Sequence, residues 1–316
     1  MNYLKFIPHI GLFVFLLPIK VFSHLTKTDT TLKISIHHDT SLHSQHLRRD
    51  IVLDIVLPPS YSSTISYPVL YMNDGQDLTR LNMKDVLQKL YQSQSIMPFI
   101  LVAIHCGDRL QEYGVAAEAD YKQRGAKAKA YTDFVLKELR PYIAQKYPVS
   151  QNPAQTVFCG FSLGGLSAFD IVWQHPEIFG KVGVFSGSFW WRSRAYENHY
   201  DDYQDRIMQR RVRESGQFGV YSSQFTVHSL EPNVGSSRAA LAFWLQTGTE
   251  DEKDDRNDNG IIDSIEDTLD LIGELEKKGY RWGKEIRYVE VKNGKHDQAT
   301  WSAIMPDFLT WAFGIK

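Results

Sequence analysis

Short apolar runs alternate with longer amphipathic stretches along most of the chain. An apolar repeat of about 3.6 residues indicates a helix, whereas an apolar run of about four to eight residues between turn signals is typical of a buried strand. The predicted strands cover 32–37, 51–57, 68–72, 99–105, 156–159, 181–185, 242–247 and 285–291, and the predicted helices cover 83–91, 128–147, 163–175, 264–278 and 301–313.

The alternation of strands and helices after residue 68 predicts an α/β fold, with a mostly parallel central sheet and helices on both faces. With 316 residues, 43% of them apolar, the chain can bury one large core. A polar segment at about 192–240, with a basic cluster at 206–213, interrupts the alternation before the strand 242–247. We expect this insertion to be either a cap over the site or a solvated surface excursion.

Residues 1–23 have the pattern of an export signal peptide. A positively charged start precedes an apolar stretch at 10–17, and small residues precede His24, where cleavage is expected. A bilayer span needs about 20 apolar residues, and Pro18 ends this run too soon. A buried N-terminal strand is the alternative. The pattern predicts a secreted or periplasmic protein whose mature part, 24–316, is one domain without a membrane span.

The charge balance bears on whether the protein binds nucleic acid, and the cysteine content bears on whether it contains disulfides. The chain has 35 Lys and Arg against 37 Asp and Glu, so no broad basic surface is expected, and nucleic acid is not an expected partner. Cys106 and Cys159 both end apolar strand-like runs. This placement predicts two free, buried thiols rather than a disulfide framework.

The sharpest motif is Gly160-Phe161-Ser162-Leu163-Gly164, between a predicted strand and a predicted helix. It is the G-x-S-x-G nucleophile elbow in the context that this motif requires. Glycines on both sides of the serine permit a tight turn that a Cβ atom would obstruct. We therefore predict that Ser162 is a nucleophile and that the amide of Leu163, at the helix N-terminus, donates to an oxyanion.

A serine hydroxyl is a poor nucleophile unless a histidine, itself held by a carboxylate, takes its proton. In an α/β-hydrolase fold the chain order is serine, acid, histidine. His296 lies between the last predicted strand and the last predicted helix, at the edge of the sheet where Ser162 is expected. A surface loop histidine is the alternative. His105 precedes the serine and fits the order badly.

The acid is expected after the strand 242–247, where the loop 248–252 offers three carboxylates. Asp251 is the preferred candidate and Glu252 the reserve, although any of the three can be a solvated charge only. The second oxyanion donor of this fold comes from the loop after its third strand. There the amide of Gln76 is the candidate, and a simple Asp-Gly turn is the alternative.

Several blocks of this sequence resemble the putative-esterase family, which includes enterochelin esterases, feruloyl esterase domains, S-formylglutathione hydrolases and mycolyl transferases. The resemblance spans about 50–316 and implies the triad Ser162, Asp251 and His296, with the amide of Gln76 as oxyanion donor. Glu252 stays open, because some mycolyl transferases place a glutamate one residue later. The long insertion and the acidic stretch after the acid depart from the family, so no substrate is implied. The blocks are Tyr71-Met72-Asn73-Asp74-Gly75-Gln76, Cys159-Gly160-Phe161-Ser162-Leu163-Gly164-Gly165, Ser186-Gly187-Ser188-Phe189-Trp190-Trp191, Gly248-Thr249-Glu250-Asp251, and His296-Asp297 followed by Trp301.

Aromatic side chains near the elbow are candidates for lining an acyl or sugar pocket, since flat rings stack on both. Ordinary core packing is the alternative for each of them. The segment 108–113 either borders the mouth of the site or is a solvated loop. The pocket candidates are Phe161, Phe189, Trp190, Trp191 and Trp301, with Trp190 preferred.

The segment 255–266 matches the twelve-position calcium loop of the EF-hand at positions 1, 3, 5, 6, 8, 9 and 12. A strand rather than a helix is expected to precede it, and a helix N-cap at 263–266 is the alternative explanation. The sequence therefore predicts a structural calcium ion. The expected ligands are Asp255, Asn257, Asn259, Ile261 through its carbonyl, Asp263 and Glu266.

Together these patterns predict a serine hydrolase that cleaves carboxylic esters and needs no cofactor for its chemistry. The expected substrate is a small-molecule or carbohydrate ester, with siderophore, feruloyl and acetyl-sugar esters as candidates. The alternatives are acyl transfer to a sugar or lipid hydroxyl, and a catalytically silent carbohydrate-binding protein.

Overall fold

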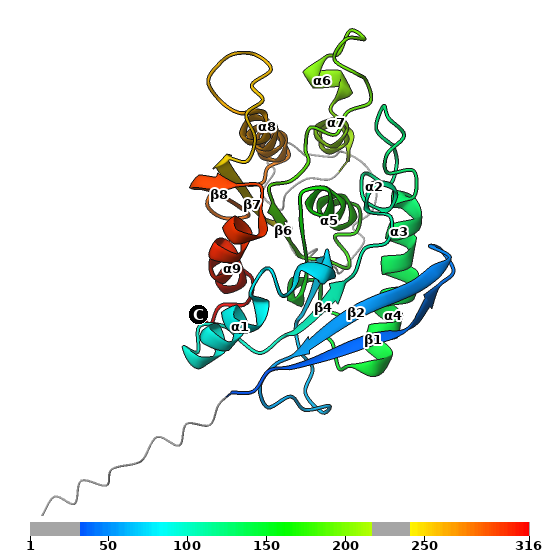
Figure 1. The fold of residues 1–316 in the computed structure, drawn as a ribbon, viewed down its shortest axis with the longest axis vertical. Helices are drawn as coiled ribbons and strands as arrows, with labels where there is room; N and C mark the ends of the chain where they lie inside the picture. The colour runs from blue at the N-terminus through cyan, green and yellow to red at the C-terminus, as the bar shows by residue number, and fades with distance from the viewer. Residues whose placement is uncertain (1–31, 217–240, 316) are drawn as a thin grey trace, which may run out of the picture. The chain divides into compact units, whose positions relative to one another are not determined.

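One eight-stranded sheet organises residues 32–216 and 241–315, the part of the chain that this computed structural model describes (Figure 1). The strand order is β1-β2-β4-β3-β5-β6-β7-β8. The strands are β1 (Ser35–Ser44), β2 (Arg49–Leu57), β3 (Val69–Asn73), β4 (Ile100–Ile104), β5 (Thr156–Phe161), β6 (Lys181–Phe185), β7 (Ala242–Glu250) and β8 (Ile286–Lys295).

The sheet is mostly parallel, as the alternation of elements predicts. Strand β2 pairs antiparallel with both β1 and β4, and the other neighbouring pairs are parallel. Strands β3, β4 and β5 are buried along their whole length, because helices cover both faces of a parallel sheet. Because these three strands are parallel, their carboxyl ends meet at one edge of the sheet. Binding and catalytic sites of such folds lie at this edge.

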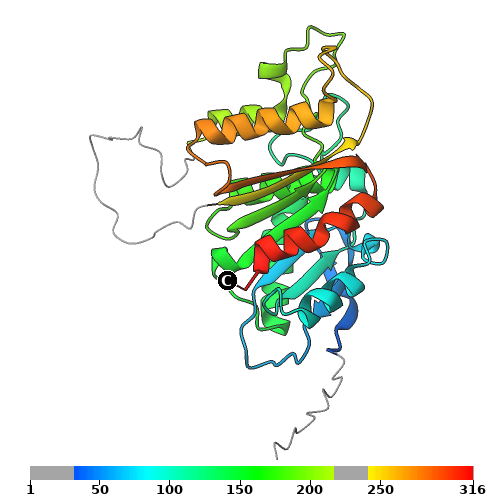
Figure 2. The ribbon, with the colours of Figure 1, turned by 90° about the vertical axis from the view of Figure 1, so that its left-hand side faces the viewer.

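Two layers of helices enclose the sheet. Helices α1 and α9 pack on one face, whereas α3, α4, α5 and α8 pack on the other, so α8 and α9 lie on opposite sides (Figures 1 and 2). The helices are α1 (Met83–Gln92), α2 (Arg109–Glu112), α3 (Ala128–Phe134), α4 (Arg140–Lys146), α5 (Leu163–Gln174), α6 (Asp202–Asp205), α7 (Ile207–Glu214), α8 (Asp263–Lys277) and α9 (Gln298–Phe313).

The structure differs from the predicted elements in several places: the short helices α2, α6 and α7 are not among the predicted helices, and β7 and β8 continue beyond the predicted ends at 247 and 291. Strand β1 continues to Ser44, beyond the predicted strand 32–37. The predicted helix 128–147 is divided by a π-helical turn, Val135–Leu139. Pro141 explains this turn, because proline has no N–H for the carbonyl one turn earlier and its ring crowds that carbonyl.

The expected insertion is only partly described. Residues 192–216 contain α6 and α7, and α7 packs against α8. Residues 217–240, and the predicted signal peptide 1–23, lie outside the described residues. In the part that is described, no helix is long and apolar enough to cross a membrane. Both cysteines are free thiols, Cys159 buried and Cys106 half-buried, which confirms the absence of a disulfide between them.

Candidate active site

Ser162 occupies a strained turn between the end of β5 and the start of α5. Its backbone has φ 53° and ψ −121°, a conformation that L-residues rarely adopt. The turn requires glycine nearby, because a Cβ on Gly160 would lie 2.2 Å from the carbonyl oxygen of Gly164. A Cβ on Gly164 would lie 2.6 Å from Oδ2 of Asp74. The predicted nucleophile elbow is thus the geometry that the chain adopts here.

The neighbouring segment after β6 reaches the same point. The hydroxyl oxygen of Ser162 lies 3.3 Å from that of Ser188, which is buried. The amide of Ser188 also donates to the carbonyl of Ser162, at 3.2 Å. Ser188 matches no catalytic motif in the sequence, although it belongs to one of the blocks that carry the family resemblance. A serine outside any catalytic motif cannot be singled out from its local sequence. Its position at the site becomes visible only when the fold places it beside Ser162.

Asp251 follows β7 and is held from two sides. The amide of Gly248 donates to its Oδ2 at 3.0 Å, and the hydroxyl of Ser186 donates to the same carboxylate. A β-bulge between Gly248 and Glu250 turns the chain at this place. Burial raises the pKa of Asp251, and these hydrogen bonds together with the nearby His296 oppose the rise.

His296 follows β8 and keeps access to solvent, with part of its ring desolvated by its neighbours. Burial lowers its pKa below the ordinary value, and the charge of Asp251 opposes that shift. The edge of its ring meets the indole of Trp301, with ring centroids 5.3 Å apart. That indole also lies 5.1 Å from the ring of Phe161, the residue before Ser162, and donates to Ser186 at 2.9 Å. Trp301 and Ser186 therefore connect the segments that carry the three triad candidates.

Glu252 faces away from this arrangement. It accepts a hydrogen bond from the backbone of Ser264 in α8, and burial raises its pKa to about 7. The principal charges that act on it are those of Asp263, Asp254 and Asp267, not that of His296. The consecutive acids Asp251 and Glu252 thus occupy different environments.

The loop after β3 carries the second oxyanion candidate. Asp74 has a left-handed backbone (φ 59°), and Arg109 holds its carboxylate with bonds of 3.0 and 3.2 Å. Arg109 also donates to the carbonyl of Phe161, so the predicted mouth segment 108–113 contacts the elbow. Gln76 lies in the 3-10 turn Gly75–Asp77, and Leu163 begins α5. Amides at such positions have no acceptor within their own helix, which leaves them free to bind an oxyanion.

The five aromatic candidates differ in their surroundings: four are core residues, and one lines a cavity. Trp190 is half-buried and lines a cavity of about 470 Å³ beside the loop 251–262, called the acid loop below. The others are at most 5% exposed, because they pack against neighbouring rings such as Phe169 and Phe185. These four core residues are Phe161, Phe189, Trp191 and Trp301.

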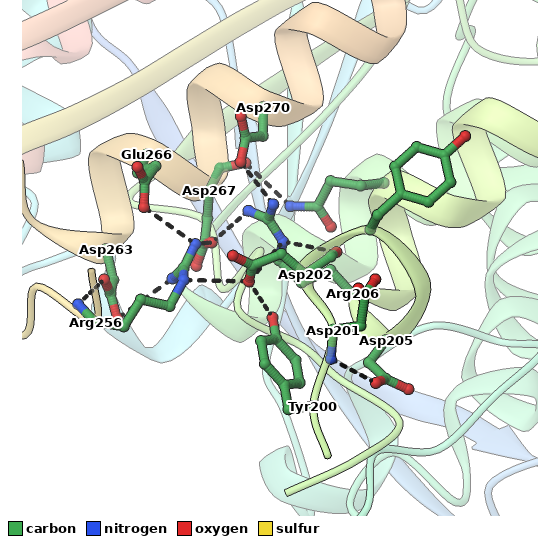
Figure 3. Close-up of polar contacts among 12 residues, drawn as sticks. Tyr200, Asp201, Asp202, Asp205, Arg206, Arg256, Asp263, Glu266, Asp267 and Asp270 are labelled. Carbon is green, nitrogen blue, oxygen red and sulfur yellow. Dashed lines mark hydrogen bonds and ion pairs between the residues drawn. The ribbon is translucent and has the colours of Figure 1, made fainter. Parts of the chain in front are cut away.

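The predicted calcium loop places its side chains close together. The amide groups of Asn257 and Asn259 lie 2.8 Å from the carboxylate of Glu266, and Asp255 accepts from the backbone amide of Gly260. Arg256 points into the same group and pairs with Asp263, as Figure 3 shows. Within 32–216 and 241–315, no set of three or more His, Cys, Asp or Glu side chains is arranged to hold a metal ion.

The profile of the family described as Putative esterase matches residues 44–312 of this sequence. The chain belongs to the Putative esterase family. Individual relatives match over shorter stretches. Protein YbbA of Bacillus subtilis (strain 168), described as uncharacterized, is 30% identical over 161 residues, which are 49% of this chain and 64% of that protein. The Iron(III) enterobactin esterase of Dickeya dadantii (strain 3937) is 36% identical over 86 residues, 26% of this chain and 20% of that protein.

Solved structures confirm the predicted fold class. The enterobactin esterase from Shigella flexneri, solved in the presence of enterobactin, has a TM-score of 0.62 at 19% identity, covering 89% of this chain and 59% of that one. A ferulic acid esterase has a TM-score of 0.63 at 18% identity, covering 90% of this chain and 98% of that one. The chain thus spans less than two thirds of several of the relatives that it matches, and at these identities the likeness is one of fold.

Arg109 gives a test of the site's electrostatics that needs no substrate. Its positive charge lowers the pKa of His296, so Arg109→Met is expected to raise that pKa. NMR titration of the His296 ring protons measures the shift. Arg109→Lys keeps the charge and should titrate closer to the wild type. If the wild type and the methionine variant titrate alike, Arg109 does not act on His296 as the structure indicates.

Proposed function

We propose that this protein is a serine esterase in which Ser162 is the nucleophile, His296 the general base and Asp251 the residue that orients the imidazole. The observation that carries the proposal is the strained backbone of Ser162 at the strand-to-helix turn, in a chain of the esterase family. Strain of this kind costs about 1–3 kcal/mol and is typical of functional positions. The order of the three residues along the chain is the order that the fold uses.

The chemistry proceeds through an acyl-enzyme. The Ser162 oxygen bonds to the ester carbonyl carbon while His296 takes the hydroxyl proton, and the amides of Leu163 and Gln76 donate to the oxyanion. The bond to the alcohol then breaks, and the protonated imidazole gives its proton to the departing oxygen. Water, deprotonated by His296, releases the acid and restores the serine. No cofactor takes part in these steps.

Asp251 is preferred over Glu252 for a geometric reason. Its carboxylate is fixed by Gly248 and Ser186, and its charge acts on His296. Glu252 is instead bonded to the first turn of α8. A carboxylate orients an imidazole only when the two are neighbours, so the two acids cannot exchange roles without moving the loop.

The triad is tested by substitution. Ser162→Ala and His296→Ala should each lower kcat/KM for p-nitrophenyl acetate by about a thousandfold or more, because nucleophile and base act as one unit. Asp251→Asn should cost far more than the matched change Glu252→Gln. Circular dichroism checks that each variant is folded. Near-normal turnover in either alanine variant excludes this mechanism, and the opposite ranking of the two acids assigns the role to Glu252.

The neighbours suggest ester classes without deciding among them. Enterobactin and ferulic acid esterases share the fold, so siderophore and feruloyl esters join acetyl-sugar esters as candidate substrates. Acyl transfer to a sugar or lipid hydroxyl would show itself by product that forms only with an added acceptor alcohol. Failure of Ser162 to react with a fluorophosphonate would instead support a silent binding protein.

We also propose that residues 1–23 are a signal peptide and that the mature protein, 24–316, is exported as one esterase domain. The sequence pattern of a charged start, an apolar stretch and small residues supports this. N-terminal sequencing of the protein recovered from the medium or periplasm should begin at His24. Recovery of the whole chain, starting at Met1, from the cytoplasm would contradict export.

A structural calcium ion in the loop 255–266 is a further part of this proposal. The sequence match supports it, as does the convergence of Asp255, Asn257, Asn259 and Glu266. Calcium prefers carboxylate, amide and backbone oxygens, and rotation of an asparagine amide exchanges its nitrogen for oxygen. The ion would hold the loop that begins at Asp251 and would not touch the substrate.

Calcium addition tests this part separately. Excess calcium should raise the melting temperature and a chelator should lower it, because an ion that binds only the folded state stabilises that state. Chelation should also lower ester turnover by loosening Asp251. Asp255→Ala combined with Glu266→Ala should abolish both responses. If calorimetry detects no binding and the wild type shows neither response, the loop is a capped acidic turn with Arg256 as its cation.

A further inference from the structure

We propose that Asn73 and Arg109 are positioning residues, which hold the two segments that carry the oxyanion donors at a fixed spacing. The donors are the amide of Gln76, in the loop after β3, and the amide of Leu163, in the elbow after β5. The proposal rests on the serine esterase function and adds to it residues that touch neither the substrate nor the reacting atoms. Each donor must lie about 2.7–3.1 Å from the oxyanion, so the spacing of the two segments decides whether both can donate at once.

The sheet aligns these two segments only as far as the strands run side by side. Strands β3 and β5 are neighbours, and the last pair in their register is Met72 with Cys159. Both donors come after that pair in their segments. Their spacing therefore depends on contacts made beyond the ends of the strands, and side chains supply these contacts.

Asn73 makes the first of these contacts. It is the last residue of β3, it is fully buried, and its Nδ2 donates to the carbonyl oxygen of Gly164 at 2.7 Å. The hydroxyl of Tyr131, which is also fully buried, donates to Oδ1 of Asn73 at 2.5 Å. A carbonyl oxygen only accepts, so the amide nitrogen must face Gly164 and the amide oxygen must face Tyr131. Both ends of this side chain are thus fixed.

Arg109 makes the second contact, on the other side of the nucleophile in the sequence. Its guanidinium donates to both carboxylate oxygens of Asp74, at 3.0 and 3.2 Å, and to the carbonyl of Phe161 at 3.0 Å. The side-chain amide of Gln76 donates to the same carboxylate at 3.1 Å. The loop after β3 is therefore bonded to the elbow both before and after Ser162.

Two glycines show how closely the loop after β3 is packed between its neighbours. A Cβ on Gly164 would lie 2.6 Å from Oδ2 of Asp74 in this loop. A Cβ on Gly75 would lie 2.7 Å from the backbone of Ala103 on β4. Van der Waals contact thus prevents the loop from moving towards the elbow or towards β4. The hydrogen bonds of Asn73 and Arg109 prevent it from moving away from the elbow.

A purely structural role for Asn73 is the competing explanation. Burying an amide costs free energy unless both of its ends are paired, and an apolar side chain of similar size would fill the same place without that cost. Hydrogen bonds fix a distance and a direction, which apolar packing does not, so the amide specifies the spacing of the two segments. The charge of Arg109 also acts on His296, so the uncharged Asn73 is the cleaner residue to test.

Substitution of Asn73 and of its partner tests the proposal. Asn73→Leu keeps a similar size and removes the bond to Gly164, whereas Tyr131→Phe removes only the hydroxyl that holds the amide. Asn73→Leu should lower kcat for p-nitrophenyl acetate about ten- to a hundredfold and Tyr131→Phe about three- to tenfold, with KM changed less than about threefold, because a small displacement of an oxyanion donor weakens the transition state more than the bound substrate.

Methylboronic acid gives a readout that a merely structural role would not move. Its boron bonds to the oxygen of Ser162, and one oxygen of the tetrahedral adduct takes the place of the oxyanion. In Asn73→Leu and Tyr131→Phe its inhibition constant should rise by the factor by which kcat/KM falls. Rates are taken per active site, counted with a fluorophosphonate, so that unfolded protein does not enter them.

Tyr67→Phe is the matched control, because it removes another buried hydroxyl, one that accepts from the amide of Ser62 at 2.9 Å. It should change neither kcat nor the inhibition constant. Full kcat per site in Asn73→Leu and Tyr131→Phe, or a loss of kcat without weaker boronate inhibition, overturns the positioning role. If Asn73→Leu does not fold, Tyr131→Phe decides in the same way. If the wild type cleaves no ester and Ser162 resists a fluorophosphonate, the serine esterase function fails, and the positioning role fails with it.

Discussion

The close approach of Gly160 to Gly164 is the constraint on which the site depends. A Cβ on Gly160 would lie 2.2 Å from the backbone oxygen of Gly164, so the strand can turn into the helix at this place only with glycine. The turn puts Ser162 at φ 53° and its amide within 2.9 Å of the carbonyl of Phe185 on β6. Backbone contacts with β6 and with the segment after it therefore hold the backbone of Ser162 in this conformation.

The sequence predicts the fold well because the apolar runs and helical repeats coincide with the observed strands and helices along most of the chain. Strands β3 to β6 are buried on both faces, so each appears as a continuous apolar run that ends where the structure ends it, within one or two residues. The π-turn at Val135–Leu139 escapes such reasoning, since apolar spacing there is still helical and only Pro141 disturbs it. Motif reasoning likewise finds Ser162, because the elbow is local in sequence.

What the sequence does not predict depends on contacts between distant segments. Ser188 approaches Ser162 from the segment after β6, and nothing in its local sequence announces the approach. The sequence makes the segment 108–113 a candidate for the mouth of the site, but the contact of Arg109 with the carbonyl of Phe161 is visible only in the fold. Composition also cannot distinguish a pocket aromatic from a core aromatic. Phe189 and Trp190 are neighbours, yet one is fully buried and the other lines a cavity. The direction of a side chain after a strand is decided by the turn that follows.

The loop after β7 shows how one turn places adjacent carboxylates in separate environments. The bulge between Gly248 and Glu250 directs Asp251 towards Ser186 and leaves Glu252 against the first turn of α8. Helix α8 is in turn anchored by Asp267 between two arginines, one of which lies inside the acid loop. Breaking such a buried pair leaves an uncompensated charge, which costs several kcal/mol, about 3–5 in comparable cases. Because Arg256 also lines the cavity beside this loop, the same contacts hold the loop after β7 and one wall of that cavity.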